Sequence, residues 1–339
     1  MKDIKDTNYL SVWVKRFLLE YLISTRNLSK NTQQSYRDTF KLLLPCMASM
    51  SKKTIDKLLI DDISGDHIKA FLLSLENDRH CSLSTRNQRL AALHAFAKFV
   101  GLNSPEHVEW CRQIQIIPFK KTEHTLITYL DKLEMDALLN APDRATDQGR
   151  RDYALLLFLY NTGARADEAA QTTIADLSIA HAQKRDLSII TIRGKGNKLR
   201  RCPLWQKTVT ELQGLIASRD NHEHVFLNRC RQPLTRFGVH NVVRRYTKEV
   251  AKKIPSINQK RVSPHTIRHT TATHLLQSGV DINTIRAWLG HVSINTTNIY
   301  AEVDLEMKAR ALACCEIIEN KNPTHFRDNK DLMSFLAAI

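Results

Sequence analysis

The chain has 339 residues, of which 42% are hydrophobic and 25% are charged, and this composition excludes a disordered or fibrous protein. Its 50 Lys and Arg residues outnumber 35 Asp and Glu, so the formal net charge is +15, which indicates either a solvated basic surface or a polyanionic partner such as nucleic acid. Seven cysteines without a CxxC pair exclude a disulfide framework and a cysteine-based zinc site, and no segment resembles a signal peptide or membrane span, so we expect a cytoplasmic protein with no membrane partner.

Residues 1–112 are expected to form an all-helical domain. Their apolar residues recur with the period of amphipathic helices. The pattern predicts four helices, which begin near Leu10, Ser29, Ser64 and Leu83. The second should end near Pro45, because proline lacks a backbone N–H, and the fourth should be ended by Gly101 and then Pro105.

A linker and a second domain follow. Residues 113–128 have no periodic apolar face and are expected to be an extended linker. Residues 129–319 should form the second domain, which starts with a helix capped by Asp131 and continues with a helix over 150–161 that stops at Gly163.

The second domain is also expected to contain a small β-hairpin. Residues 188–193 are rich in β-branched side chains, residues 194–197 form a Gly-Lys-Gly-Asn turn, and residues 198–204 return. Three or more helices follow to about residue 319. Residues 320–339 are expected to be a C-terminal tail with a short apolar helix.

The segment 263–300 contains the most informative group of polar residues. Ser263 and Pro264 are typical of a helix start, and His265 and Arg268, three residues apart, share one face of that helix. His291 directly follows a helix stop at Gly290, and Tyr300 lies nine residues later. A guanidinium binds two phosphate oxygens at once, an imidazole transfers protons near neutral pH, and a phenol becomes a nucleophile when a base and cations assist it. These groups together suit attack on a phosphodiester without a metal.

In its motifs the sequence resembles the tyrosine recombinase, or phage integrase, family, most closely the simple Xer-type members. The Thr-Gly-x-Arg-x-x-Glu box is present at 162–168, and the hairpin lysine motif at 194–198 is followed by Arg200, Arg201 and Pro203-Leu204. The His-x-x-Arg-His-Thr box is present at 265–270, Leu-Gly-His at 289–291, and the tyrosine at 300. Each motif alone is weak, but their order and spacing are specific. The resemblance extends over about residues 10–305.

The resemblance implies a role for each matched residue. Arg165 and Arg268 would hold the scissile phosphate, Tyr300 would attack it to form a 3′-phosphotyrosyl bond, and Lys195 would protonate the leaving 5′ oxygen. His265 would help to move the tyrosine proton, and His291 would bond the phosphate. Glu168 would orient the first box. Lys198 remains an alternative to Lys195, and no cofactor or metal is expected.

The resemblance also implies a fold and partners. The expected fold is mainly α with a small β-sheet, in which a helical core-binding domain and a catalytic domain form a C-shaped clamp on double-stranded DNA. Four protomers would synapse two specific sites, with the tail docking on a neighbouring protomer and with a partner recombinase or accessory protein as a further possibility. The basic residues on helical faces would be solvated or would contact the DNA backbone: Arg86, Arg89, Arg244, Arg245, Lys248, Lys252 and Lys253.

Three other functions are compatible with parts of the sequence. A type IB topoisomerase uses the same chemistry without pairing two sites, but it would not need the core-binding signature near residues 27–32. A DNA-binding regulator would not need the complete reactive set. A zinc hydrolase could use His265 and His269, four apart on a helix, but Arg268 lies between them and the glutamate of the metalloprotease motif is missing.

Overall fold

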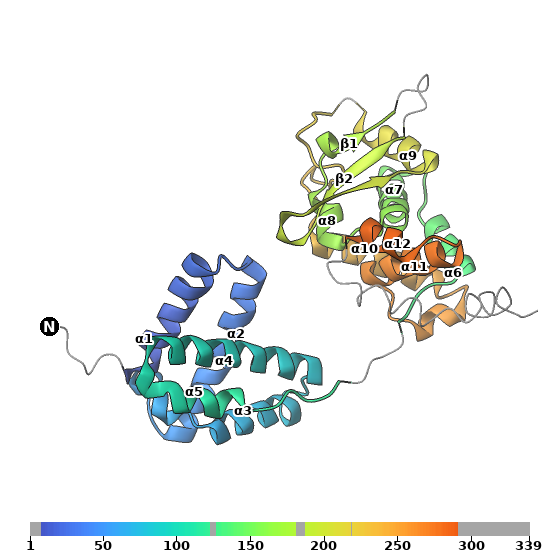
Figure 1. Ribbon diagram of the computed structural model, residues 1–339. Helices are drawn as coiled ribbons and strands as arrows, with labels where there is room; N and C mark the ends of the chain where they lie inside the picture. Colours follow the sequence, from blue (N-terminus) through green and yellow to red (C-terminus); the bar gives the residue numbers. More distant parts are fainter. Residues whose placement is uncertain (1–7, 123–126, 181–186, 218, 291–339) are drawn as a thin grey trace, which may run out of the picture. The chain divides into compact units, whose positions relative to one another are not determined.

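A computed structural model describes residues 8–122, 127–180, 187–217 and 219–290 of the chain. The chain divides into two compact units, residues 1–124 and 125–339 (Figure 1). Both units are mostly helical, and the second contains a three-stranded sheet, so the predicted mainly α fold with a small sheet is confirmed. None of the helices within the described ranges is long and apolar enough to cross a membrane.

The first unit is a helical bundle around an aromatic core. Its elements are α1 (Leu10–Arg16), η2 (Phe17–Thr25), α2 (Lys30–Ser51), η3 (Ile55–Lys57), η4 (Ile60–Asp62), α3 (Gly65–Asn77), α4 (Leu83–Asn103), η5 (Pro105–His107) and α5 (Val108–Gln115). Phe17 is fully buried, and its ring lies 5.3 Å from Phe96 and 6.0 Å from Phe40, centroid to centroid. Such edge-to-face contacts add to the stabilisation from apolar burial.

Local signals locate the helix starts of this unit better than the helix ends. Ser29 and Ser64 cap α2 and α3 as predicted, because their hydroxyls accept hydrogen bonds from backbone N–H groups of the first turn. The end predicted near Pro45 is wrong, and α4 runs past Gly101 to Asn103, where it ends just before Ser104 and the predicted Pro105. Helix α2 continues through Pro45 to Ser51, with the buried residues Leu43 and Met47 anchoring it on either side of the proline.

Gly101 lies inside α4 because two helices approach each other closely there. A Cβ atom at this position would come within 2.9 Å of the Cβ and Sγ atoms of Cys111 on α5. The glycine therefore serves packing rather than helix termination.

Pro118 and Lys120, which follow α5, are hydrogen-bonded to side chains of α4. Helix α5 includes the first three residues of the expected linker. The Asn87 side chain accepts a hydrogen bond from the N–H of Lys120 (3.1 Å) and donates one to its carbonyl (2.7 Å). Arg86 is buried, donates to the carbonyl of Pro118, and pairs with Glu76. The side chain of Arg86 is thus occupied by intramolecular contacts.

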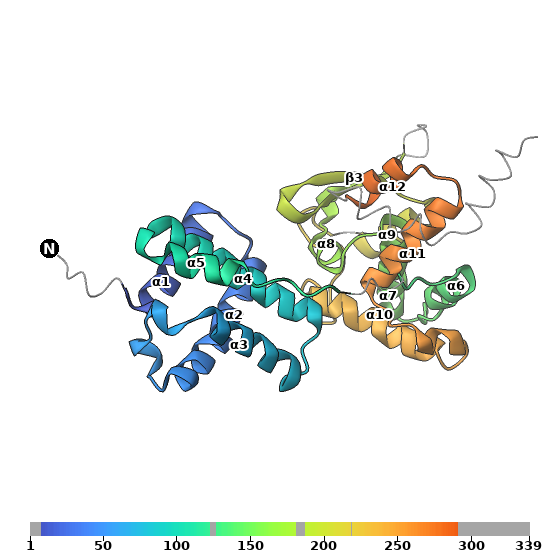
Figure 2. The same cartoon turned by 60° about the horizontal axis from the view of Figure 1, so that its bottom comes forward.

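The second unit is built around helix α7. Its elements are α6 (Lys132–Asn140), α7 (Asp147–Thr162), α8 (Ala166–Gln171), η6 (Ile174–Asp176), β1 (Leu177–Ser178), β2 (Ile189–Arg193), η7 (Lys195–Asn197), β3 (Leu199–Pro203), α9 (Gln206–Ile216), α10 (Arg236–Val250), η8 (Pro255–Gln259), α11 (Pro264–Gln277) and α12 (Ile282–Leu289). Residues 152–162 of α7 are buried on every side of the helix. Helices α6, α8, α9 and α11 all contact α7, and Figure 2 shows α11 running beside it.

The predicted hairpin is present, with one additional strand. Strands β2 and β3 pair antiparallel, and Ile192 lies opposite Arg200 while Ile190 lies opposite Cys202. These four side chains are buried, so they form the inner face of the sheet. The short strand β1 pairs with the other edge of β2 and was not predicted, because two residues give no readable alternation.

Candidate active site

The first box forms a tight turn that leads from α7 into α8. Gly163 ends α7 in the left-handed conformation (φ +59°), and a Cβ atom there would lie 2.5 Å from a methyl carbon of Leu289. Arg165 follows at the N-cap position of α8. Its backbone N–H donates to Glu168 Oε2 (2.9 Å) and its guanidinium Nη1 donates to Oε1 (2.6 Å). Glu168 thereby fixes both the backbone and the side chain of Arg165.

Glu168 also pairs with a second arginine that comes from the sheet. Arg200 Nη2 donates to Glu168 Oε2 at 2.7 Å, and both side chains are at most 8% exposed. Burial by itself would raise the pKa of Glu168, but hydrogen bonds and charge from Arg200 and Arg165 outweigh it and lower that pKa to about 2. The carboxylate is therefore ionised at any physiological pH.

Arg268 on α11 connects the C-terminal ends of two other helices. Its position on α11 follows from the Ser263 cap and Pro264, which start that helix as predicted. The side chain is 3% exposed, and it donates to the carbonyl of Gly163 (2.6 Å) and to the carbonyl of Leu289 (2.5 Å). The guanidinium is held between the C-terminal ends of α7 and α12, and its plane is fixed.

His265 lies one turn before Arg268 on α11 and is exposed. Partial desolvation, and then the charges of Arg268 and Arg165, lower its pKa below the ordinary value, with a smaller contribution from His240 on α10. The ring is neutral at pH 7 and has a nitrogen able to accept a proton. His269 is more buried, and desolvation lowers its pKa to about 4.

Lys195 lies in the turn between β2 and β3, and the structure describes its backbone only. The turn closes through a hydrogen bond of 2.8 Å from the N–H of Gly194 to the carbonyl of Lys198. Gly194 lies directly over the ion pair, since a Cβ atom there would be 3.4 Å from Glu168 Oε1 and 3.6 Å from Arg200 Nη1. The lysine turn is thus in contact with the group that holds Arg165.

His291 and Tyr300 lie outside the described residues. The description ends at Gly290, which closes α12 in the left-handed conformation (φ +66°) next to Arg200. The structure brings Arg165, Arg268, His265 and the turn that holds Lys195 to one place, and their catalytic roles stay predictions. Arg200 has no predicted role in the sequence beyond its place in the hairpin motif. The sign that could have identified it is a charged residue at an inward-facing position of a strand.

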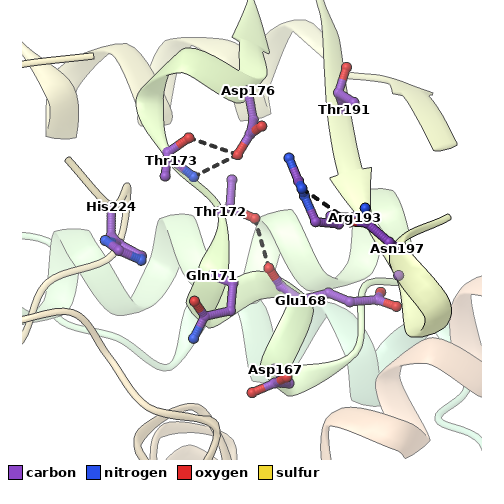
Figure 3. Close-up of a pocket in the computed structure, with 11 residues that line it drawn as sticks. Asp167, Glu168, Gln171, Thr172, Thr173, Asp176, Thr191, Arg193, Asn197 and His224 are labelled. Atoms are coloured by element: carbon purple, nitrogen blue, oxygen red, sulfur yellow. Dashed lines mark hydrogen bonds between the residues drawn. The ribbon is translucent and has the colours of Figure 1, made fainter. Parts of the chain in front are cut away.

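A polar cavity of about 480 Å³ borders the same turn (Figure 3). Its polar groups bond mainly to one another: Asp176 accepts from the N–H (2.9 Å) and hydroxyl (2.8 Å) of Thr173, and Arg193 donates to Asn197 (3.1 Å). The Asp176 contacts cap η6, and the Arg193–Asn197 contact lies within the hairpin. No group of three or more His, Cys, Asp or Glu in the described ranges is arranged to hold a metal ion.

The sequence was compared with known families. Residues 128–307 match the phage integrase family, and residues 14–101 match the N-terminal SAM-like domain of phage integrases. The integrase/recombinase y4rC of Sinorhizobium fredii is 35% identical over 332 residues, which cover 97% of this chain and 98% of y4rC. Tyrosine recombinase XerC of Pelobacter propionicus is 30% identical, over 84% of this chain and 89% of the relative.

Solved structures share the fold. The integrase of transposon Tn1549, solved with circular intermediate DNA, aligns over 90% of this chain and 99% of its own, with a TM-score of 0.67 and 18% identity. The XerH recombinase, in a pre-cleavage complex with its difH substrate, aligns over 90% and 94%, with a TM-score of 0.62 and 22% identity.

Proposed function

The chain belongs to the phage integrase family of tyrosine recombinases, enzymes that cleave and rejoin DNA at specific sites, and from this premise we propose that it exchanges strands through a covalent bond to Tyr300. Arg165 and Arg268 bind the non-bridging oxygens of the scissile phosphate. Tyr300 attacks phosphorus, and the bond to the 5′ oxygen breaks. His265 accepts the phenol proton, Lys195 gives a proton to the 5′ oxygen, and His291 bonds the phosphate.

The observation that carries this proposal is the fixed geometry of the two arginines. Arg165 is held by Glu168, and Arg268 is held by the carbonyls of Gly163 and Leu289. Donors that are fixed before the reaction need no reorganisation when charge develops on the phosphate, so they stabilise the transition state selectively. The phosphotyrosyl bond keeps the energy of the broken phosphodiester, and the proposed reaction therefore requires neither ATP nor a metal.

We propose double-stranded DNA with a specific recombination site as the substrate. The two units would close on it as a clamp, and four protomers would pair two sites, with residues 320–339 docking on a neighbouring protomer. The net charge of +15 and the DNA complexes solved for Tn1549 integrase and XerH support the DNA partner. Family membership favours this reading over the topoisomerase and the zinc hydrolase.

Helix α10 offers a surface for the DNA backbone. Four exposed basic residues recur every fourth position along it, at Arg236, His240, Arg244 and Lys248. In the part of the chain that the structure describes, none of the four has an ion-pair partner, and the neighbouring cations Arg244 and Lys248 repel each other weakly. In contrast, Arg245 on the same helix pairs with the buried Asp152. We infer that the unpaired face contacts DNA phosphates.

Replacing Arg244 and Lys248 together by glutamine should flatten the salt dependence of DNA binding. Each lost phosphate contact reduces the slope of log K against log salt by about 0.9. The slope is measured by fluorescence anisotropy with a labelled duplex over a series of salt concentrations. Arg112→Gln is the control, because Arg112 is exposed but paired with Glu109 at 2.8 Å. Equal slopes for both variants would rule out this surface.

The covalent step is tested with a suicide substrate, a nicked duplex that carries the recombination site and traps the cleaved strand. Wild type and Tyr300→Phe are incubated with it in EDTA and separated under denaturing conditions. We expect an adduct with wild type and none with Tyr300→Phe, while both bind the intact duplex equally. An adduct with both proteins would mean that another residue is the nucleophile, and binding without any adduct would leave a DNA-binding role alone.

A further inference from the structure

Arg200 is a buried cation on the inner face of the sheet. Its side chain is 8% exposed and shares that face with Ile190, Ile192 and Cys202. Transfer of a guanidinium out of water costs several kcal/mol unless good partners compensate for it. The Nε atom of Arg200 is also buried and has no hydrogen-bond partner among the described residues. An apolar side chain at this position would fit the rest of the face better, so the charge calls for another explanation.

The guanidinium lies close to three separate segments of the chain, through one hydrogen bond and two close glycines. It donates to Glu168 Oε2 at 2.7 Å. Cβ atoms built on two glycines would lie within 3.6 Å of its Nη1 atom, at Gly194 and at Gly290, and the latter would also be 3.1 Å from its Cδ atom. At Gly290 (φ +66°) the approach is tight, so glycine is needed there, whereas a Cβ at Gly194 would make an ordinary van der Waals contact with Arg200.

Each of these segments leads directly to a residue of the proposed reaction. Glu168 holds Arg165 through two hydrogen bonds. Gly194 immediately precedes Lys195, and Gly290 immediately precedes His291. Building on the proposed function, we propose that Arg200 is a positioning residue for DNA cleavage, which fixes the relative positions of Glu168, Gly194 and Gly290 and thereby of the chain that leads into the reacting residues.

A positioning role differs from a purely structural one in what it predicts. If Arg200 only stabilised the fold, its loss would reduce the fraction of folded protein and leave the folded molecules fully active. If it positions the reacting groups, folded molecules will bind DNA normally but cleave it slowly, because a displacement of about 1 Å can cost on the order of 100-fold in rate.

The experiment compares Arg200→Met, Arg200→Lys and the control Arg201→Gln with wild type. Arg201 is the next residue on β3, and its side chain is exposed on the opposite face. DNA affinity is measured by anisotropy, and the single-turnover rate constant of adduct formation is measured at saturating suicide substrate. This rate constant reports only on folded molecules, since unfolded ones reduce the amplitude instead.

We expect Arg200→Met to cleave about 100-fold more slowly than wild type with DNA affinity within about threefold. Arg200→Lys should recover part of the rate, because it returns a cation to Glu168, and Arg201→Gln should cleave at the wild-type rate. The proposal is wrong if the rate constants of both Arg200 variants equal that of wild type, or if affinity falls in parallel with rate. If Arg200→Met does not fold, the rate constant of Arg200→Lys decides by the same criteria. Absence of an adduct with wild type would instead overturn the proposed function, and this proposal with it.

Discussion

Arg268→Lys is expected to slow DNA cleavage by roughly 100-fold to 1000-fold, the loss typical of removing one fixed donor to a developing anion. Lysine keeps the positive charge but replaces a planar fork by a single ammonium group. It cannot hold the carbonyls of Gly163 and Leu289 and present donors to the phosphate in the same fixed plane. DNA affinity should change little, because the net charge is preserved.

The single-turnover rate constant at saturating suicide substrate measures this effect. Arg286→Lys, a change of the same kind on α12, is the matched control and should cleave at the wild-type rate. Some loss of stability is also expected in Arg268→Lys, since a buried carbonyl without a donor costs about 1–3 kcal/mol. A wild-type rate constant in Arg268→Lys would show that Arg268 serves the fold alone and would leave Arg165 as the arginine that binds the phosphate.

Features encoded by neighbouring residues could be predicted from the sequence. The helix starts at Asp131 and Ser263 were predicted correctly, because a capping side chain bonds to N–H groups only a few residues away. Gly163 and Gly290 were predicted to end their helices, and both are left-handed C-caps in the structure. These local signals need no knowledge of the tertiary fold.

Features that depend on distant contacts could not be predicted in the same way. Gly101 resembles a helix stop, and only the proximity of Cys111 reveals that it serves helix packing. Arg86 looked like part of a polar face, but it is buried against Glu76 and the carbonyl of Pro118. The link between Arg200 and Glu168 spans 32 positions in sequence, and neither residue by itself indicates it.

Glu168→Gln is expected to destabilise the second unit by about 3–5 kcal/mol, because removing one partner of a buried ion pair leaves the other charge uncompensated. The cations left without a carboxylate partner would be Arg200, whose side chain is 8% exposed, and Arg165, whose side chain is 33% exposed. The pKa of Glu168 gives a consistent magnitude. Its fall from 4.5 to about 2 corresponds to about 3–4 kcal/mol, at about 1.4 kcal/mol per pKa unit.

The free energy of unfolding is measured by urea titration with tryptophan fluorescence. The chain has four tryptophans, and replacing Trp13 and Trp110 of the first unit by phenylalanine leaves Trp205 and Trp288 to report on the second unit alone. Asp167→Asn in the same background is the control. Asp167 neighbours Glu168 on α8 but is exposed, so its change should stay within about 0.5 kcal/mol.

The pH dependence of the difference between wild type and Glu168→Gln identifies the carboxylate as the cause. The folded pKa of Glu168 lies below the unfolded value, so its stabilisation is complete above about pH 4.5 and is lost as the pH falls toward about 2. The half-buried His269 has a pKa of about 4, and its protonation weakens both proteins as the pH falls from 6.5 to about 4. That loss cancels in the difference. A difference of about 3 kcal/mol at neutral pH that vanishes between pH 4.5 and 2 supports the ion pair, whereas a difference that is constant with pH would assign the effect to packing.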